Sequence, residues 1–319
     1  MLLSGCYFSG NSLEGTKKSV IGVIVGSFDD TWRTGMRNEL YKLAEGKVDI
    51  SIWSGYGSQE NENKKVDLLI EKKVNVLAVN LVEKTAASTI IEKAKKADIP
   101  VVFFNVEPNQ EDLKKWDKVY YVGAKAEQSG SMQGQILTQY FKANPTKDGI
   151  IRYVMIKGPA EHQDAIMRTK YSVKAMEDAG LKLKLVAEDY GMWQRSKGQE
   201  IMQNFLKAYD GSIDCVIANN DDMALGAIDA LKTKGYFSNG KYMPVVGVDD
   251  TSTAIKALRD GTLLGTVLND DVGQGDAIYN LSTILADGKV PNKENYSYSI
   301  TDNRYVWIEY KMINKDNIN

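Results

Sequence analysis

Short runs of aliphatic and β-branched residues alternate with helix-period patterns along most of this chain. Strands that alternate with amphipathic helices are typical of βαβ units, in which successive strands run parallel. We interpret as strands the apolar runs at residues 20–25, 48–53, 76–80, 101–105, 119–122, 150–156, 183–188, 215–218, 245–248 and 264–268. The helical patterns between them include residues 60–72, 85–97, 127–141, 164–179 and 222–234. The pattern therefore predicts an α/β protein.

The alternation restarts after Gly123, which indicates two doubly wound parallel-sheet lobes. The last part differs, because a helix over residues 271–286 is followed by two closely spaced strands, at 296–300 and 304–309. We interpret this part as chain that crosses between the lobes at residues 302–306, in addition to crossings near Gly123 and Asn269, which gives a three-strand hinge. The expected organisation is a tether over residues 1–18, an N-terminal lobe over 19–123 and 270–303, and a C-terminal lobe over 124–269 and 304–319.

Polar residues follow the carboxyl ends of strands in both halves of the chain. In an open parallel sheet, ligands bind beyond these ends. For any one position the ordinary explanation is a helix N-cap, because Asn and Asp are favoured there. Recurrence in both halves favours a binding site, and paired amide and carboxylate groups suit a ligand with neighbouring hydroxyls. The residues are Asp29, Asp30, Asn80, Asn105, Asn219, Asn220, Asp249 and Asn269.

Two tryptophans lie near strand ends in different halves. Trp32 follows Asp30 by two residues, and Trp193 follows the strand at residues 183–188. A pyranose ring has two apolar faces and a rim of hydroxyls, so its site uses flat aromatic surfaces with polar groups around the edge. The alternative is that each ring anchors a loop.

A charged run begins at His162, after another strand end. Asp164 and Arg168 are four residues apart and therefore share a helix face. A surface ion pair beside a solvated histidine is the ordinary explanation. The position at a strand end favours the cleft between the lobes.

Composition excludes several classes of protein. The 319 residues, 43% of them hydrophobic, are enough for two ordinary domains. With 40 basic and 42 acidic residues, the net charge of -2 gives no reason to expect a nucleic-acid partner. No glycine-rich phosphate-binding motif occurs. His162 is the single histidine, so sites with several imidazole ligands cannot form. No apolar run approaches the roughly 20 residues of a membrane-spanning helix.

Of the two cysteines, Cys6 ends the tetrapeptide Leu3-Ser4-Gly5-Cys6, which is similar to a lipobox. Such a pattern marks where a lipoprotein signal is cut and the thiol acylated, and it leaves a tether. The alternative is an unstructured tail with an incidental cysteine, and residues 1–3 are too few to hold the charged and apolar regions of a signal. Because Cys215 lies in an apolar strand, we expect no disulfide between the two.

Specific short stretches are spread over nearly the whole chain after Ser19. They are Asn80-Leu81-Val82, Val101-Val102-Phe103-Phe104-Asn105, Glu107-Pro108, Tyr120-Tyr121-Val122-Gly123, the His-x-Asp-x-x-x-Arg run at His162, Met192-Trp193, Val216-Ile217-Ala218-Asn219-Asn220-Asp221, Gly247-Val248-Asp249 and Gly265-Thr266-Val267-Leu268-Asn269-Asp270. Together they resemble the galactose/glucose-binding proteins of bacterial sugar ABC importers, which are type I periplasmic binding proteins.

The resemblance implies a non-enzymatic protein that closes on its hinge over D-glucose or D-galactose. It implies a permease and an ATPase as partners, a possible chemoreceptor, and a monomer that is extracytoplasmic and either periplasmic or lipid-anchored at Cys6. Asp30 would accept a hydrogen bond from the 4-hydroxyl of either epimer. The stacking pair would be Trp32, where Phe is usual, and Trp193. The polar rim would be Asp30, Asn105, His162, Asp164, Arg168, Asn220, Asp249 and Asn269.

Many members of that family hold calcium in an EF-hand-like loop, whose counterpart here is residues 144–152. The position that closes the loop with Gln is Arg152, and the distant Glu is Asp214. We therefore expect no metal and no cofactor, with the Arg152 guanidinium paired to Asp148 or Asp214 in place of the ion. The alternatives are that Arg152 points to solvent or that calcium still binds.

Two other functions stay open at this point. A sugar-responsive transcription regulator shares this fold, but it needs a DNA-binding headpiece, and residues 1–18 are too few for one. A glycosidase using Asp30 and Asp249 would need carboxylates about 5 to 10 Å apart across the glycosidic bond. A site rich in amides favours binding over turnover.

Overall fold

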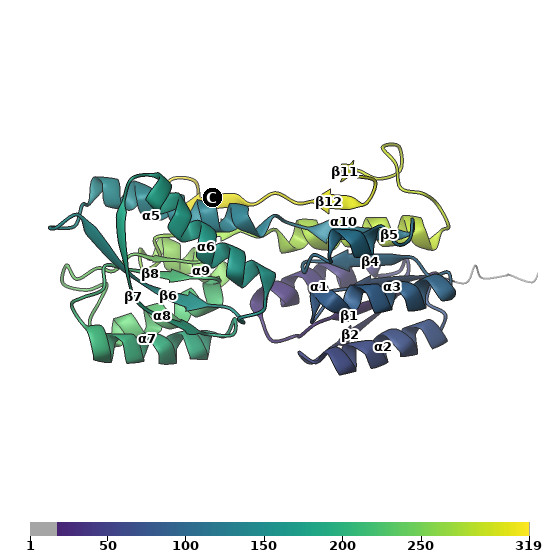
Figure 1. Cartoon of the computed structure of the whole chain (residues 1–319), viewed down its shortest axis with the longest axis horizontal. Helices are drawn as coiled ribbons and strands as arrows, with labels where there is room; N and C mark the ends of the chain where they lie inside the picture. The colour runs from purple at the N-terminus through teal and green to yellow at the C-terminus, as the bar shows by residue number, and fades with distance from the viewer. Residues whose placement is uncertain (1–17, 319) are drawn as a thin grey trace, which may run out of the picture.

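The computed structural model describes residues 18–318, which form two α/β lobes side by side along the long axis of the molecule (Figure 1). Each lobe holds one mostly parallel sheet with helices on both faces. The predicted fold class is confirmed. All strands predicted over residues 20–268 are present, with bounds that shift by at most two residues.

The first lobe contains a seven-stranded sheet in the order β11-β12-β5-β4-β3-β1-β2. All neighbours in it are parallel except β11 and β12. Its strands are β1 (Val20–Val25), β2 (Asp49–Ser54), β3 (Val76–Val79), β4 (Val101–Phe104), β5 (Val119–Gly123), β11 (Ile300–Thr301) and β12 (Tyr305–Trp307). Its helices are α1 (Thr31–Ala44), α2 (Gln59–Glu71), α3 (Ala87–Lys96), which follows the 3-10 turn η1 (Lys84–Ala86), α4 (Gln110–Leu113) and α10 (Asp271–Ala286).

Alternate side chains of the first strands enter two different cores. Val23 and Val25 of β1 pack in one cluster with residues of α1 and α10, whereas Ile24 packs in another with residues of α2 and α3. This division follows from the two-residue period of a strand. It explains why the strands are apolar on both faces, as expected for a covered parallel sheet.

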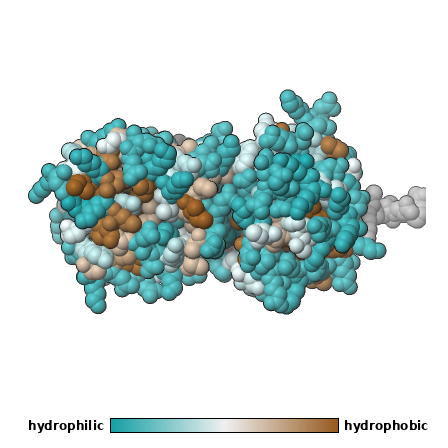
Figure 2. Space-filling view, viewed as in Figure 1, coloured by the Kyte–Doolittle hydropathy of each residue, from teal (hydrophilic) through white to brown (hydrophobic). Residues whose placement is uncertain are grey.

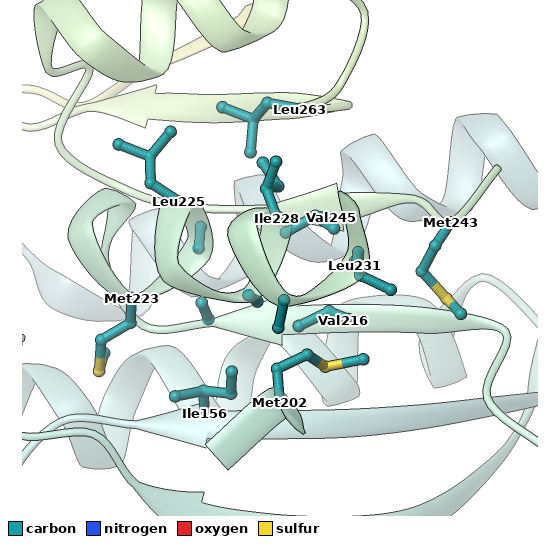
Figure 3. Packing of buried hydrophobic residues seen from close by; sticks show 14 of the residues in the cluster. Ile156, Met202, Val216, Met223, Leu225, Ile228, Leu231, Met243, Val245 and Leu263 are labelled. Carbon is teal, nitrogen blue, oxygen red and sulfur yellow. The ribbon is translucent and has the colours of Figure 1, made fainter. Parts of the chain in front are cut away.

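The second lobe contains a six-stranded sheet in the order β13-β10-β9-β8-β6-β7, with β13 antiparallel to β10. Its strands are β6 (Ile150–Lys157), β7 (Lys182–Tyr190), β8 (Cys215–Ala218), β9 (Val245–Val246), β10 (Gly265–Leu268) and β13 (Lys311–Asn314). Its helices are α5 (Ala126–Ala143), α6 (Gln163–Asp178), α7 (Arg195–Tyr209), α8 (Asp221–Thr233) and α9 (Ser252–Arg259). Figure 3 shows Ile228 and Leu231 of α8 packed near Val216 and Val245 of the sheet.

The C-terminal part corrects the predicted lobe boundary. Residues 304–319 are predicted to lie in the second lobe, but β12 pairs with β5 and therefore belongs to the first sheet. Tyr305 and Trp307 pack against Tyr121, with ring centroids 6.0 and 5.4 Å away. The last crossing consequently follows Trp307, and the chain then enters β13 (Figure 1). Most of the strand predicted at 296–300 is irregular, with only Ile300 inside β11.

Within residues 18–318, no helix is long and apolar enough to cross a membrane. Cys215 is buried and carries a free thiol. Cys6 and almost all of the predicted tether lie outside the described residues. Lipidation at Cys6 therefore stays a prediction.

Candidate functional site

A cavity with an empty volume of about 310 Å³ lies between the lobes, where strand ends of both sheets meet. The structure brings all ten predicted site residues together around it. The lining residues are Asp30, Trp32, Arg33, Asn105, His162, Asp164, Arg168, Trp193, Asn220, Asp249 and Asn269. The first four belong to the first lobe, Asn269 lies on a crossing, and the rest belong to the second lobe.

Several of these residues are helix N-caps as well as cavity residues. Asp30 accepts a hydrogen bond from the backbone N–H of Arg33 at 2.7 Å, and Asn220 accepts one from Met223 at 3.0 Å. The Nδ1 atom of His162 accepts one from the N–H of Asp164 at 3.2 Å. The cap explanation and the binding explanation are therefore compatible. Each cap accepts a hydrogen bond from an otherwise unpaired backbone N–H at the start of a helix, and this bond holds the side chain at the cavity.

The backbone at three cavity residues is left-handed. The φ angles are 61° at Asn105, 125° at Asp249 and 66° at Trp193. Asn and Asp tolerate positive φ, but a bulky side chain rarely adopts it. Such strain is typical of functional sites, where the surrounding structure holds an unusual conformation.

A buried charged network forms the second-lobe side of the cavity. The side chain of Arg168 is only 3% exposed, and its Nη2 lies 3.2 Å from Asp164 Oδ2. Its Nη1 donates to the carbonyl of Asn219 at 2.8 Å and lies 3.8 Å from Asp249 Oδ1. Burial raises the pKa of the Asp249 carboxyl well above its ordinary value, although Arg168 acts in the opposite direction. Pairing is what makes these buried charges tolerable.

His162 is neutral near pH 7, because burial lowers its pKa to about 4. Its Nδ1 is an acceptor, so the ring proton is assigned to Nε2. Nε2 is buried and has no hydrogen-bond partner among the described residues. The ring meets Trp193 edge-on, with centroids 5.1 Å apart. The cavity therefore contains an N–H donor that only a ligand or water can satisfy.

The two tryptophans enter the cavity from opposite lobes. Trp32 is 6% exposed, and its Nε1 donates to the carbonyl of Asn269 at 2.7 Å. Trp193 packs so closely on Gly158 that a Cβ there would lie 2.3 Å from its Cη2 atom. The Arg168 guanidinium lies 5.8 Å from the centroid of the Trp193 ring. Both rings are firmly held and both line the cavity.

Arg33 lines the cavity although it is not among the ten predicted site residues, and three of the strand-end residues, Asp29, Asn80 and Asn219, do not line it. The spacing of Arg33 from Asp30 is the ion-pair spacing of a helix, and this was the available signal. Asn80 and Asn219 lie beneath the cavity instead. Asn80 Oδ1 accepts from the N–H of Gly26 at 3.2 Å, and Asn219 Oδ1 accepts from that of Gly158 at 3.0 Å. Asp29 bonds to Ser27 away from the cavity.

The loop that corresponds to the family's calcium site carries an internal ion pair. Arg152 Nη2 pairs with Asp148, and its Nη1 lies 3.2 Å from the other Asp148 oxygen and 3.6 Å from Asp214. The Arg152 hydrogen bond lowers the pKa of Asp148 to about 2. A guanidinium among these oxygens opposes a second cation, so the residues present do not fit calcium. Among residues 18–318, no group of three or more His, Cys, Asp or Glu could hold a metal ion.

A polar and aromatic cavity between two doubly wound lobes defines a two-lobed protein that binds a small polar ligand. The model of the periplasmic binding protein domain matches residues 21–290, and the chain belongs to that family. Members of the family are substrate-binding components of transporters. The chain is therefore not an enzyme, and the glycosidase alternative is wrong. The family also places the chain outside the cytoplasm.

Individual relatives cover most of the chain. It is 38% identical to the D-galactose/methyl-galactoside binding periplasmic protein of Haemophilus influenzae, over 93% of this chain and 90% of that protein. It is 30% identical to the galactofuranose-binding protein of Escherichia coli, over 84% and 82%. A solute-binding protein of Bacillus halodurans, solved with bound myo-inositol, has a TM-score of 0.78 at 26% identity, over 96% of this chain and 97% of that one.

Proposed function

We propose that this chain binds D-glucose and D-galactose in the cavity between the lobes and delivers them to an ABC permease with its ATPase. The observation that carries this proposal is the arrangement of the cavity, where Trp32 and Trp193 enter from opposite lobes among nine polar side chains. Apolar rings within a polar rim complement the faces and the edge of a pyranose. The relative from Haemophilus influenzae is named for D-galactose, which agrees with this ligand.

The hydrogen-bonding groups of the cavity suit a neutral polyol. Arg168 and the Nε2–H of His162 donate, Asp30, Asp164 and Asp249 accept, and the Asn amides do both. Every sugar hydroxyl both donates and accepts, so each can meet groups of either kind. An anionic ligand would meet Asp30, Asp164 and Asp249 as well as the two arginines, so the wall is not a purely cationic site.

The proposal also includes a lipid anchor at Cys6 and the absence of bound calcium. Acylation at Cys6 would tether a monomer to the outer face of the cell membrane through residues 7–17, and docking on a chemoreceptor is a further expectation. Arg152 takes the place of calcium, so neither a chelator nor added calcium changes the melting temperature or the sugar affinity. A loss of both on chelation, reversed by calcium, would contradict this.

Calorimetry with a panel of ligands tests the sugar. Glucose and galactose should release heat and change tryptophan emission, whereas ribose, xylose, maltose and myo-inositol should bind far more weakly. Trp193→Ala should weaken binding by roughly 1 to 3 kcal/mol, the scale of one large aromatic contact. Trp53→Phe is the matched control, because Trp53 lies in the edge strand β2 away from the cavity. Absence of heat and of an emission change with both hexoses would refute the proposal.

A further inference from the structure

Arg33 is a second cation in the cavity, and it lies in the lobe opposite Arg168. It belongs to the first turn of α1, three residues after the cap Asp30. Its side chain is 11% exposed and that of Asp30 is 9% exposed. A guanidinium that is buried to this extent needs hydrogen-bond or ion-pair partners. The partners of Arg33 therefore indicate what the side chain does in the cavity.

The contacts of Arg33 connect both polar rim residues of the first lobe. Its Nη1 pairs with Asp30 Oδ2, while its backbone N–H donates to Asp30 Oδ1. Its Nε donates to Asn80 Oδ1 at 3.2 Å. Asn80 Nδ2 in turn donates to Asn105 Oδ1 at 3.1 Å. Asp30, Arg33, Asn80 and Asn105 therefore form one hydrogen-bonded unit, which we call the first-lobe rim.

The guanidinium of Arg33 has unused capacity toward the cavity. Arginine carries five N–H groups in a rigid fork. Nη2 of Arg33 has no hydrogen-bond partner within residues 18–318. The pKa of His162, in the other lobe, is lowered mainly by burial, and the positive charge of Arg33 lowers it further. The charge of Arg33 therefore acts across the cleft. Arg33 thus faces the space that the ligand would occupy.

Arg37, one turn later on the same helix, provides an internal comparison. Its guanidinium lies 3.8 Å from the centroid of Phe28, and its Nη2 donates to Thr34 Oγ1 at 3.0 Å. It is not among the residues that line the cavity. The same residue type on the same helix therefore differs from Arg33 mainly in its access to the cavity.

We propose that Arg33 determines ligand specificity by donating from Nη2 to the same sugar hydroxyl whose proton Asp30 accepts. One hydroxyl is then held between a carboxylate and a guanidinium, and both hydrogen bonds are charge-assisted. The link to Asn80 and Asn105 keeps this pair in place before the ligand arrives. This inference rests on the proposed function, because it concerns the same cavity and a neutral hexose.

The test combines three variants with monodeoxy sugars. Arg33→Met, Asp30→Asn and the control Arg37→Met are titrated by calorimetry with glucose, galactose and the 2-, 3-, 4- and 6-deoxy forms of the tighter hexose. Asn at position 30 preserves the helix cap. Arg33→Met should weaken binding of the parent hexose by about tenfold or more, the scale of a hydrogen bond to a charged group. Arg37→Met should leave it unchanged.

The decisive result is which missing hydroxyl abolishes the loss of affinity caused by Arg33→Met. For one monodeoxy sugar only, Arg33→Met and wild type should bind equally, and the same sugar should cancel the effect of Asp30→Asn. An equal loss with every deoxy sugar would mean that Arg33 acts on the structure as a whole, and different positions for the two variants would mean separate roles. Either result overturns the inference while the proposed function stands. A wild-type protein that binds no hexose overturns both.

Discussion

Trp193 combines an unusual backbone conformation with a tight contact, and the contact depends on a glycine that follows β6. Its φ of 66° is rare for a bulky residue, and its indole lies directly over Gly158. A Cβ at Gly158 would lie 2.3 to 2.6 Å from three atoms of the six-membered ring. The absent side chain of Gly158 thus allows the ring to take its place at the cavity wall.

Gly158→Ala should therefore displace the indole and weaken sugar binding by at least about 1 kcal/mol, within the range of losing an aromatic contact. Calorimetry and tryptophan emission measure the two effects. The double variant Gly158→Ala with Trp193→Phe separates the cause, since Phe lacks the ring atoms that would clash. Relative to Trp193→Phe alone, the added alanine should cost little. A further loss of the same size would show that Gly158 acts through something other than Trp193.

At the scale of elements, Asp221 ties together four segments of the second lobe. It begins α8 and is fully buried. Its Oδ1 accepts from the hydroxyl of Thr266 on β10 at 2.6 Å, and its Oδ2 accepts from the N–H of Thr251, the cap of α9, at 2.9 Å. Its own N–H donates to the carbonyl of Val248, just after β9, at 2.7 Å. Burial raises the pKa of this carboxyl to about 7.

A raised pKa gives a defined dependence of stability on pH. The folded protein holds the Asp221 proton more tightly than the unfolded chain, whose carboxyl has the ordinary value of 3.8. The stabilisation from this group is therefore complete below about pH 4 and is lost as the pH rises through 7. Asp221→Asn should remove up to ~3 kcal/mol of the decline in unfolding free energy between pH 5 and pH 8.

Urea unfolding of wild type and Asp221→Asn at both pH values measures this difference. The matched control is Asp229→Asn, since Asp229 lies on the same helix and pairs with Arg195 at the surface. The control should decline like the wild type. If the free energy of unfolding depended on pH in the same way for all three proteins, ionisation of Asp221 would not destabilise the folded state, and the prediction would be wrong.

At the scale of the whole molecule, direct contacts hold the lobes together beside the cavity. Asp222 of α8 accepts two hydrogen bonds from Thr31 of α1, from the N–H at 3.3 Å and from the hydroxyl at 3.1 Å. Glu107 accepts one from Gln163 of α6 at 3.3 Å. Burial raises the pKa of both carboxyls. The space-filling view shows the lobes in contact at a narrow waist, with several hydrophobic patches on the second lobe (Figure 2).

Because Asp222 and Glu107 do not line the cavity, they stabilise the closed arrangement without touching the ligand. Asp222→Ala should weaken the binding of every sugar by the same factor, roughly five- to tenfold, since one charged acceptor is lost. The preference between glucose and galactose should not change. Small-angle scattering of the sugar-free variant should show a larger radius of gyration than that of the wild type.

Asp229→Ala serves as the control, because its partner lies in the same lobe. A changed preference between the two hexoses would indicate that Asp222 acts on the ligand after all. Unaltered affinity together with an unaltered radius of gyration would show that the Thr31 contact adds nothing to closure.

The sequence by itself determined the repeated βαβ pattern, the restart after Gly123 and, through the family resemblance, ten of the eleven residues that line the cavity. This was possible because parallel strands of four or more apolar residues carry strong local signals, as in β1 and β8, and because their carboxyl ends converge. Topology then brings the strand-end residues toward the same edge of each sheet, before any side chain is packed.

Only the tertiary structure decided the lobe of β12, the pairing of β13 and the position of Arg33. A three-residue strand such as β12 has almost no pattern of its own, and its lobe is set by β5 and by the Tyr121 ring. Asn80 and Asn219 end strands just as Asn105 and Asn220 do, yet both are fully buried and bond to backbone. The neutral state of His162 likewise depends on burial between lobes that are far apart in sequence. Desolvation and side-chain pairing are properties of the assembled site, so no local pattern records them.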